Sequence, residues 1–82
     1  MSNRDRYDSA FRSAFELDST YQLSDLRYQS IEDWDSIGHM ALMSELEDAF
    51  DITIKTEDLI QFESYIQGAE ILTRYSIDLE AQ

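Results

Sequence analysis

The fold of this chain is decided by one stretch, DSIGHMALMSELEDAFDITI, which spans residues 35–54. Asp35 is a good N-cap residue, because its carboxylate can accept a hydrogen bond from the free N–H groups of a first helical turn. Apolar side chains then recur on one helical face, at Leu42, Met43, Leu46 and Phe50. We therefore expect a helix over residues 36–50. Ser36 would lie in its first turn, where the helix dipole would stabilise an attached phosphate.

A second apolar strip on the same helix comprises Ile37, Met40 and Ala41, next to Ser36. The rest of the helix surface is strongly negative, with acidic side chains at Glu45, Glu47, Asp48 and Asp51. A small apolar strip edged by carboxylates fits a docking surface for another protein, and it fits an extension of the core equally well. The residues alone leave both interpretations open.

The spacing of these residues resembles that of the acyl carrier protein family, whose members bind phosphopantetheine. The matching set comprises Asp35-Ser36-Ile37, Leu42, Leu46-Glu47, Phe50 and Ile52 or Ile54. An Asp-Ser pair alone is not informative, because it also occurs at Asp8-Ser9 and Asp18-Ser19. The resemblance fits the chain from end to end, so we expect a free-standing carrier.

The resemblance implies that 4′-phosphopantetheine is attached to Ser36 by a phosphopantetheinyl transferase. A ligase or transferase would attach acyl groups to it as thioesters. Ketosynthase-type or other acyl-processing enzymes of fatty-acid, polyketide or related lipid metabolism would receive them. The chain itself would not be an enzyme. By matching positions, the resemblance also implies a partner-facing surface that comprises Asp35, Ile37, Met40, Glu47, Asp48 and Ile54. The residues themselves favour another placement for Ile54: residues 51–55 form a short β-branched connection in which Ile52 and Ile54 would point inward.

Three positions depart from the family pattern. Many members have acidic residues where this chain has Gly38 and Ala41, and a leucine is common where it has Trp34. These departures point toward carriers of specialised pathways. Two alternatives remain: a peptidyl or aminoacyl carrier, which shares the attachment motif, and an unmodified acidic interaction module, which would tolerate Ser36→Ala.

Composition limits the other kinds of function. The 82 residues, 43% of them hydrophobic, suffice for one compact domain, and the chain has no cysteine and a single histidine, His39. This inventory argues against catalysis and against a metal site. Asp33, Asp35 and Gly38 match part of an EF-hand calcium loop, but Ile37 and Ser44 stand where that loop needs an oxygen ligand and a bidentate glutamate. The formal net charge of −12 would repel nucleic acid and anionic membranes. With neither a signal peptide nor a membrane span in view, we expect a cytoplasmic monomer.

The remaining segments predict a small all-α four-helix bundle, with three longer helices, one short helix and a long first loop. The resemblance implies the same acyl-carrier-like arrangement. An apolar stripe that includes Tyr7, Phe11 and Phe15 predicts a first helix over about 3–17, capped by Ser2 with Asp5. Scattered apolar residues would anchor the loop over 18–34 across the ends of the helices. Thr56 would cap a short helix over 57–61, and Ser64 with Gln67 would cap a last helix over 65–75. We expect one domain over 1–82, with a frayed tail over 76–82.

Overall fold

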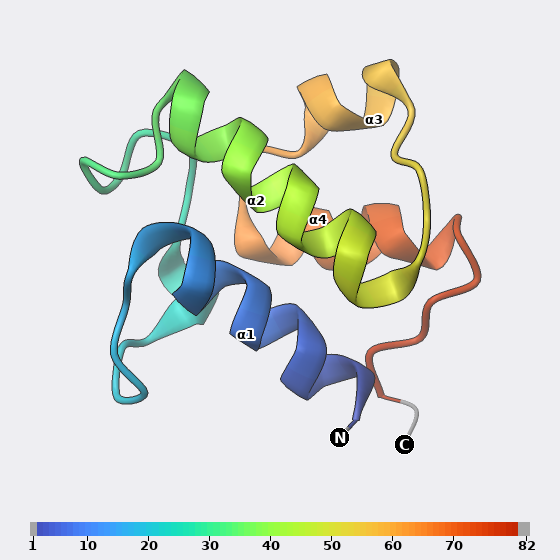
Figure 1. The fold of residues 1–82 in the computed structure, drawn as a ribbon, viewed down its shortest axis with the longest axis horizontal. Helices are drawn as coiled ribbons and strands as arrows, with labels where there is room; N and C mark the ends of the chain where they lie inside the picture. Colours follow the sequence, from blue (N-terminus) through green and yellow to red (C-terminus); the bar gives the residue numbers. More distant parts are fainter. Residues whose placement is uncertain (1, 81–82) are drawn as a thin grey trace.

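Four α-helices and one short 3₁₀ turn build the fold, for which a computed structural model describes residues 2–80 (Figure 1). The elements are α1 (Asn3–Phe15), η1 (Leu23–Asp25), α2 (Ser36–Phe50), α3 (Thr56–Gln61) and α4 (Tyr65–Thr73). In Figure 1, α1 and α2 cross the front of the molecule, α4 passes behind α2, and the short α3 lies beside the first half of α2. The small all-α class, with one short helix and a long loop before α2, is confirmed.

Side-chain caps fix the starts of three helices, as the sequence predicts. Ser2 and Asp5 form a complete capping box at α1, and Asp35 caps α2. At α4 the Ser64 hydroxyl accepts from the N–H of Gln67, which is one of the two bonds of the capping box expected from this pair. The short α3 is different. It begins at Thr56 itself, its N-cap position is Lys55, and no side chain caps it. The prediction that Thr56 caps this helix is therefore wrong.

Two helices end earlier than expected. Helix α1 stops at Phe15 rather than at residue 17, because Glu16 adopts the left-handed conformation (φ 54°, ψ 44°) and its N–H bonds the carbonyl of Arg12. Helix α4 stops at Thr73 rather than at residue 75. The chain then turns back at Ser76, where φ is 63°, and the N–H of Ile77 bonds the carbonyl of Leu72.

Aromatic rings form the centre of the core. Phe11 is fully buried, and its ring lies 5.0–6.3 Å, between centroids, from five other aromatic rings, those of Tyr7, Phe15, Trp34, Phe62 and Tyr65. Trp34 is also fully buried, so the end of the long first loop is anchored in the core. Leu23 and Leu26 anchor the middle of that loop, as expected from their apolar character.

Gly68 allows α4 to pack closely on the core. A Cβ atom at this position would overlap the ring of Phe62 and would lie 2.5 Å from the hydroxyl oxygen of Tyr7. That hydroxyl donates to the carbonyl oxygen of Tyr65, one turn away on α4, at 2.5 Å. The glycine thus makes room for a polar contact that joins α1 to α4, which offsets its low helix propensity.

The tail beyond α4 is packed against the body of the protein rather than frayed, over the part that the structure describes. Ile77 and Leu79 are 7% and 6% exposed. The side-chain amide of Asn3 donates to the carbonyl of Asp78, and Arg4 pairs with Glu80 at 2.6 Å. The expectation of a frayed tail is wrong for residues 76–80, because two apolar side chains return to the core; residues 81–82 lie outside the described range.

Candidate functional site

Ser36 is the first residue of α2, and its side chain is exposed. Asp35 precedes it in extended conformation, and one carboxylate oxygen accepts from the N–H of Gly38 at 2.8 Å. The N–H of His39 donates to the Asp35 carbonyl, which closes the first helical turn. The predicted cap and the predicted helix bounds, Ser36–Phe50, are both confirmed. The Ser36 hydroxyl therefore lies at the positive end of a fifteen-residue helix, open to a reagent from solvent.

Gly38 is required by the loop that precedes the helix. A Cβ atom at this position would overlap the carbonyl oxygen of Asp33 and would lie 3.3 Å from the ring of Phe15. The backbone of the loop therefore lies directly on the first turn of α2. An acidic side chain at this position, as many carrier proteins have, would not fit without displacing the loop.

His39 connects three segments of the chain. Its ring is buried, Nδ1 accepts a hydrogen bond from the indole Nε1–H of Trp34 at 2.9 Å, and Nε2 lies 2.8 Å from the carbonyl oxygen of Leu59 in α3. An indole N–H can only donate and a carbonyl can only accept, so these partners define a neutral ring with its hydrogen on Nε2. Because both nitrogens are engaged within the protein, His39 has no free nitrogen to activate the Ser36 hydroxyl.

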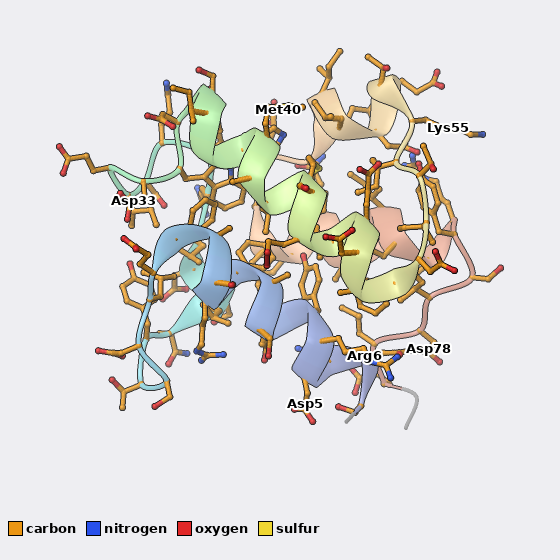
Figure 2. All side chains as sticks on the ribbon, in the orientation of Figure 1. Asp5, Arg6, Asp33, Met40, Lys55 and Asp78 are labelled. Atoms are coloured by element: carbon orange, nitrogen blue, oxygen red, sulfur yellow. The ribbon has the colours of Figure 1, made fainter. Side chains whose placement is uncertain are left out.

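A pocket of about 370 Å³ opens beside Ser36, between α2 and α3. It is lined by Tyr28, Ser36, His39, Met40, Leu59, Ile60, Phe62 and Glu63. Met40 lies on the side of α2 that faces α3 (Figure 2). Most of the walls are apolar or aromatic, so the pocket offers a hydrophobic surface within reach of the serine hydroxyl.

The apolar strip next to Ser36 is exposed. Ile37 is 81% exposed and Met40 is 54% exposed, so neither side chain extends the core. Ile60 of α3, which is 66% exposed, adds to the same surface across the pocket. Asp35 and Ala41 are exposed as well. The structure thus favours an open surface over the core extension that the sequence left equally plausible.

The other three residues of the expected partner surface lie elsewhere. Glu47 is roughly 16 Å farther along the axis of α2 than Ser36, and its carboxylate accepts from the N–H of Ile54 at 2.8 Å. Asp48 is exposed on the same distant turn. Ile54 is only 7% exposed and belongs to the core. Its assignment to a partner-facing surface is wrong in this conformation, because its side chain points inward, as the residues of the connection had favoured.

Several residues that line the pocket were not predicted from the sequence. Tyr28 comes from the first loop, whereas Leu59, Phe62 and Glu63 come from α3 and the connection after it. Backbone hydrogen bonds join these segments, from the N–H of Tyr28 to the carbonyl of Glu63 at 2.7 Å and from the N–H of Tyr65 to the carbonyl of Leu26 at 3.0 Å. The ring of Tyr28 then packs edge-on against that of His39 in α2, with 5.6 Å between centroids. The one available sequence signal was His39, the single histidine of the chain, next to the apolar strip of this helix.

Neither a metal centre nor a membrane span is found in residues 2–80. In this range no three His, Asp or Glu side chains are grouped so that they could hold a metal ion. None of the helices described has the length and apolar character needed to cross a bilayer.

Comparisons with known proteins add no assignment. No family model, no curated protein and no solved structure matches this chain.

Proposed function

We propose that the chain is an acyl carrier protein that carries 4′-phosphopantetheine on the Ser36 oxygen. One observation carries the proposal. An exposed serine hydroxyl stands at the start of a fifteen-residue helix, is preceded by an aspartate cap, and opens beside an apolar pocket of about 370 Å³. The spaced pattern from Asp35 to Ile54, which resembles the carrier family, supports the same function.

The residues around Ser36 fit this group. A phosphate ester on the Ser36 oxygen would lie at the positive end of α2, near N–H groups of the first turn that lack partners within the helix. The apolar walls beside Ser36 offer a surface for a flexible arm and an acyl group. When attached, the group supplies the thiol that this cysteine-free chain lacks, and the thiol holds acyl groups as thioesters.

The attachment step needs a partner enzyme. The Ser36 oxygen would form a bond to the phosphorus of the pantetheine phosphate in coenzyme A, the pyrophosphate bond would break, and adenosine 3′,5′-bisphosphate would leave. The hydroxyl proton must go to a base on the transferase, because both nitrogens of His39 are already engaged. This arrangement supports a passive carrier rather than an enzyme.

The exposed strip gives partner enzymes a place to dock. Ile37, Met40 and Ile60 would make the apolar contact, and the net charge of −12 would steer the carrier toward basic surfaces. Acyl-loading enzymes and ketosynthase-type enzymes of fatty-acid, polyketide or related pathways are the partners we infer, in a cytoplasmic setting. The contact between the loop and Gly38 supports partners that differ from those of a general fatty-acid carrier.

The test is intact mass spectrometry after incubation with coenzyme A, magnesium and a broad-specificity phosphopantetheinyl transferase. Wild type should gain one phosphopantetheine group and Ser36→Ala should gain none. Ser19→Ala is the matched control, because Asp18-Ser19 repeats the dipeptide in an exposed turn outside any helix, and it should gain the group as wild type does.

A folded wild-type protein that gains nothing, beside a control carrier that does, would overturn the proposal. The exposed strip in an acidic surface would then favour the unmodified interaction module. If Ser36 is modified, loading the thiol in turn with acyl and aminoacyl groups by the matching ligases would separate an acyl carrier from a peptidyl or aminoacyl carrier.

A further inference from the structure

The hydrogen bond between Trp34 and His39 depends on the charge state of the imidazole ring. Nδ1 serves as acceptor for the indole N–H at 2.9 Å, and the two rings stack at 16° with their centroids 6.2 Å apart. Trp34 is fully buried, so water cannot replace His39 as the acceptor. The chain contains one histidine and one tryptophan, and the structure places them against each other.

We propose that His39 is a proton-sensitive tie that holds the end of the first loop against the start of α2. Protonation would place a hydrogen on Nδ1. The indole N–H of Trp34 and the new N–H of His39 would then be two donors facing each other, and the hydrogen bond between the rings would be lost. The contact from Nε2 to the Leu59 carbonyl would persist, because Nε2 donates in both charge states. Acid should therefore loosen the loop and leave α3 attached.

The effect would reach the surroundings of Ser36 through the backbone. Trp34 follows Asp33, whose carbonyl oxygen lies against Gly38 in the first turn of α2. A displacement of the indole would move this part of the loop. It would also disturb the contact between the rings of Trp34 and Phe15 of α1, whose centroids are 5.2 Å apart. The tie is independent of any modification at Ser36, so it stands whether or not the chain is a carrier.

Few other titratable groups lie near this ring. Glu63, which follows α3, and Tyr28 of the first loop line the same pocket, and Asp35 caps α2 one turn earlier. The ring of Phe62 and the backbone of Leu59 complete the contacts from the α3 side. Among the described residues, the one hydrogen bond of the indole N–H is the bond to Nδ1 of His39.

The test is an NMR titration of the complete chain from about pH 8 to about pH 5, the range in which histidine changes charge. The ring nitrogens of His39, the indole N–H resonance of Trp34 and the tryptophan fluorescence should all change with one midpoint, while the helical circular dichroism stays constant. Relative to a non-titrating variant at each pH, exchange of the indole hydrogen with solvent should rise about fivefold below the midpoint, as expected for the loss of one hydrogen bond.

His39→Gln is that non-titrating variant, because its amide can donate and accept but gains no charge. It should lose the pH response of the indole, whereas Glu63→Gln should keep it. Protonation of the ring without a change at the indole would overturn the proposal, and so would a ring that stays neutral until the helices unfold. If His39→Gln does not fold, these two outcomes in wild type still decide the question.

Discussion

Two regions of this small protein are held in different ways. The region formed by α1 and the first loop is held by rings, since Tyr7, Phe11, Phe15 and Trp34 are all buried and stack in edge-on or tilted pairs. The short helix α3 is held mainly by polar contacts. Its one buried side chain is the charged Asp58, and only Leu59 of α3 packs in part against the core.

The attachment of α3 consists of a few hydrogen bonds and one ion pair. Asp58 accepts from Arg74 and from the Tyr75 hydroxyl, at 2.6 Å each, and the same hydroxyl accepts from the N–H of Lys55 at 2.9 Å. His39 adds the bond to the Leu59 carbonyl. The two walls of the pocket beside Ser36 therefore differ in character. One wall belongs to α2, which packs on the aromatic core, and the other to a helix that depends on charge and hydrogen bonding.

Removing a central ring should have the largest effect, because the aromatic region supports the whole fold. Phe11→Ala should lower the free energy of unfolding by about 3–5 kcal/mol, through lost burial and the cavity that remains. Urea unfolding followed by circular dichroism measures the change. Ile60→Ala is the control on α3, where the side chain is 66% exposed, and it should stay within about 0.5 kcal/mol of wild type. Similar losses in both variants would refute the contrast between the two regions.

Weakening the attachment of α3 should have a smaller and local effect. Asp58→Asn should lower the free energy of unfolding by about 1–2 kcal/mol, because Asp58 is buried but Arg74 remains half exposed and can be solvated again. Hydrogen exchange should accelerate in α3 and not in α1.

The second ion pair of the described residues provides a matched control for this variant. Arg4 and Glu80 are joined at the same 2.6 Å, but both side chains are exposed, by 44% and 79%. Glu80→Gln should therefore change stability by less than about 0.5 kcal/mol. An equal loss in the two variants would show that burial does not decide the strength of these pairs.

The smallest expected effect is a loss of stability at alkaline pH, and it involves Tyr65 of α4, whose ring packs on those of Tyr7 and Phe11. Burial, and then the hydrogen bond that Tyr65 donates to Asp8, raise the pKa of Tyr65 from 10.0 to about 12. The folded state thus holds the phenol proton more tightly than the unfolded state does. This contribution is complete below pH 10 and is lost as the pH rises toward 12.

Denaturant midpoints measured between these two pH values test this expectation. Tyr65→Phe should show a shallower decline than wild type, and a part of the decline should remain because burial also raises the pKa of Tyr7. Tyr21→Phe, at an exposed position, should keep the wild-type slope. If Tyr65→Phe declines as steeply as wild type, the phenol of Tyr65 does not contribute.

Local patterns were sufficient to predict where the three longer helices begin. Asp35, Ser64 and the Ser2–Asp5 pair bond N–H groups only three residues away, so the sequence contains both partners of each cap. Helix ends were harder to predict. The left-handed residues that end α1 and α2 are Glu16 and Asp51 rather than glycine, and both glycines serve close packing instead. The usual sequence mark of a helix end is therefore missing.

The candidate site divides in the same way. Ser36, Ile37 and Met40 were predicted together because one helix displays them on neighbouring turns. Tyr28, Leu59, Phe62 and Glu63 were missed because loop, helix and connection meet there only after folding. Ile54 was placed on the partner surface by resemblance to a family, but contacts made from other segments bury it.

Interactions within a few residues account for the helical class, the start of each longer helix and the position of Ser36 in the first turn of α2, so the sequence alone predicted them. The tertiary structure decided the rest. It buried Trp34 against His39, attached α3 through Asp58, and returned Ile77 and Leu79 to the core. The physical reason is that each of these contacts joins residues that acquire a common environment only when separate segments pack together, and no local pattern specifies that environment in advance.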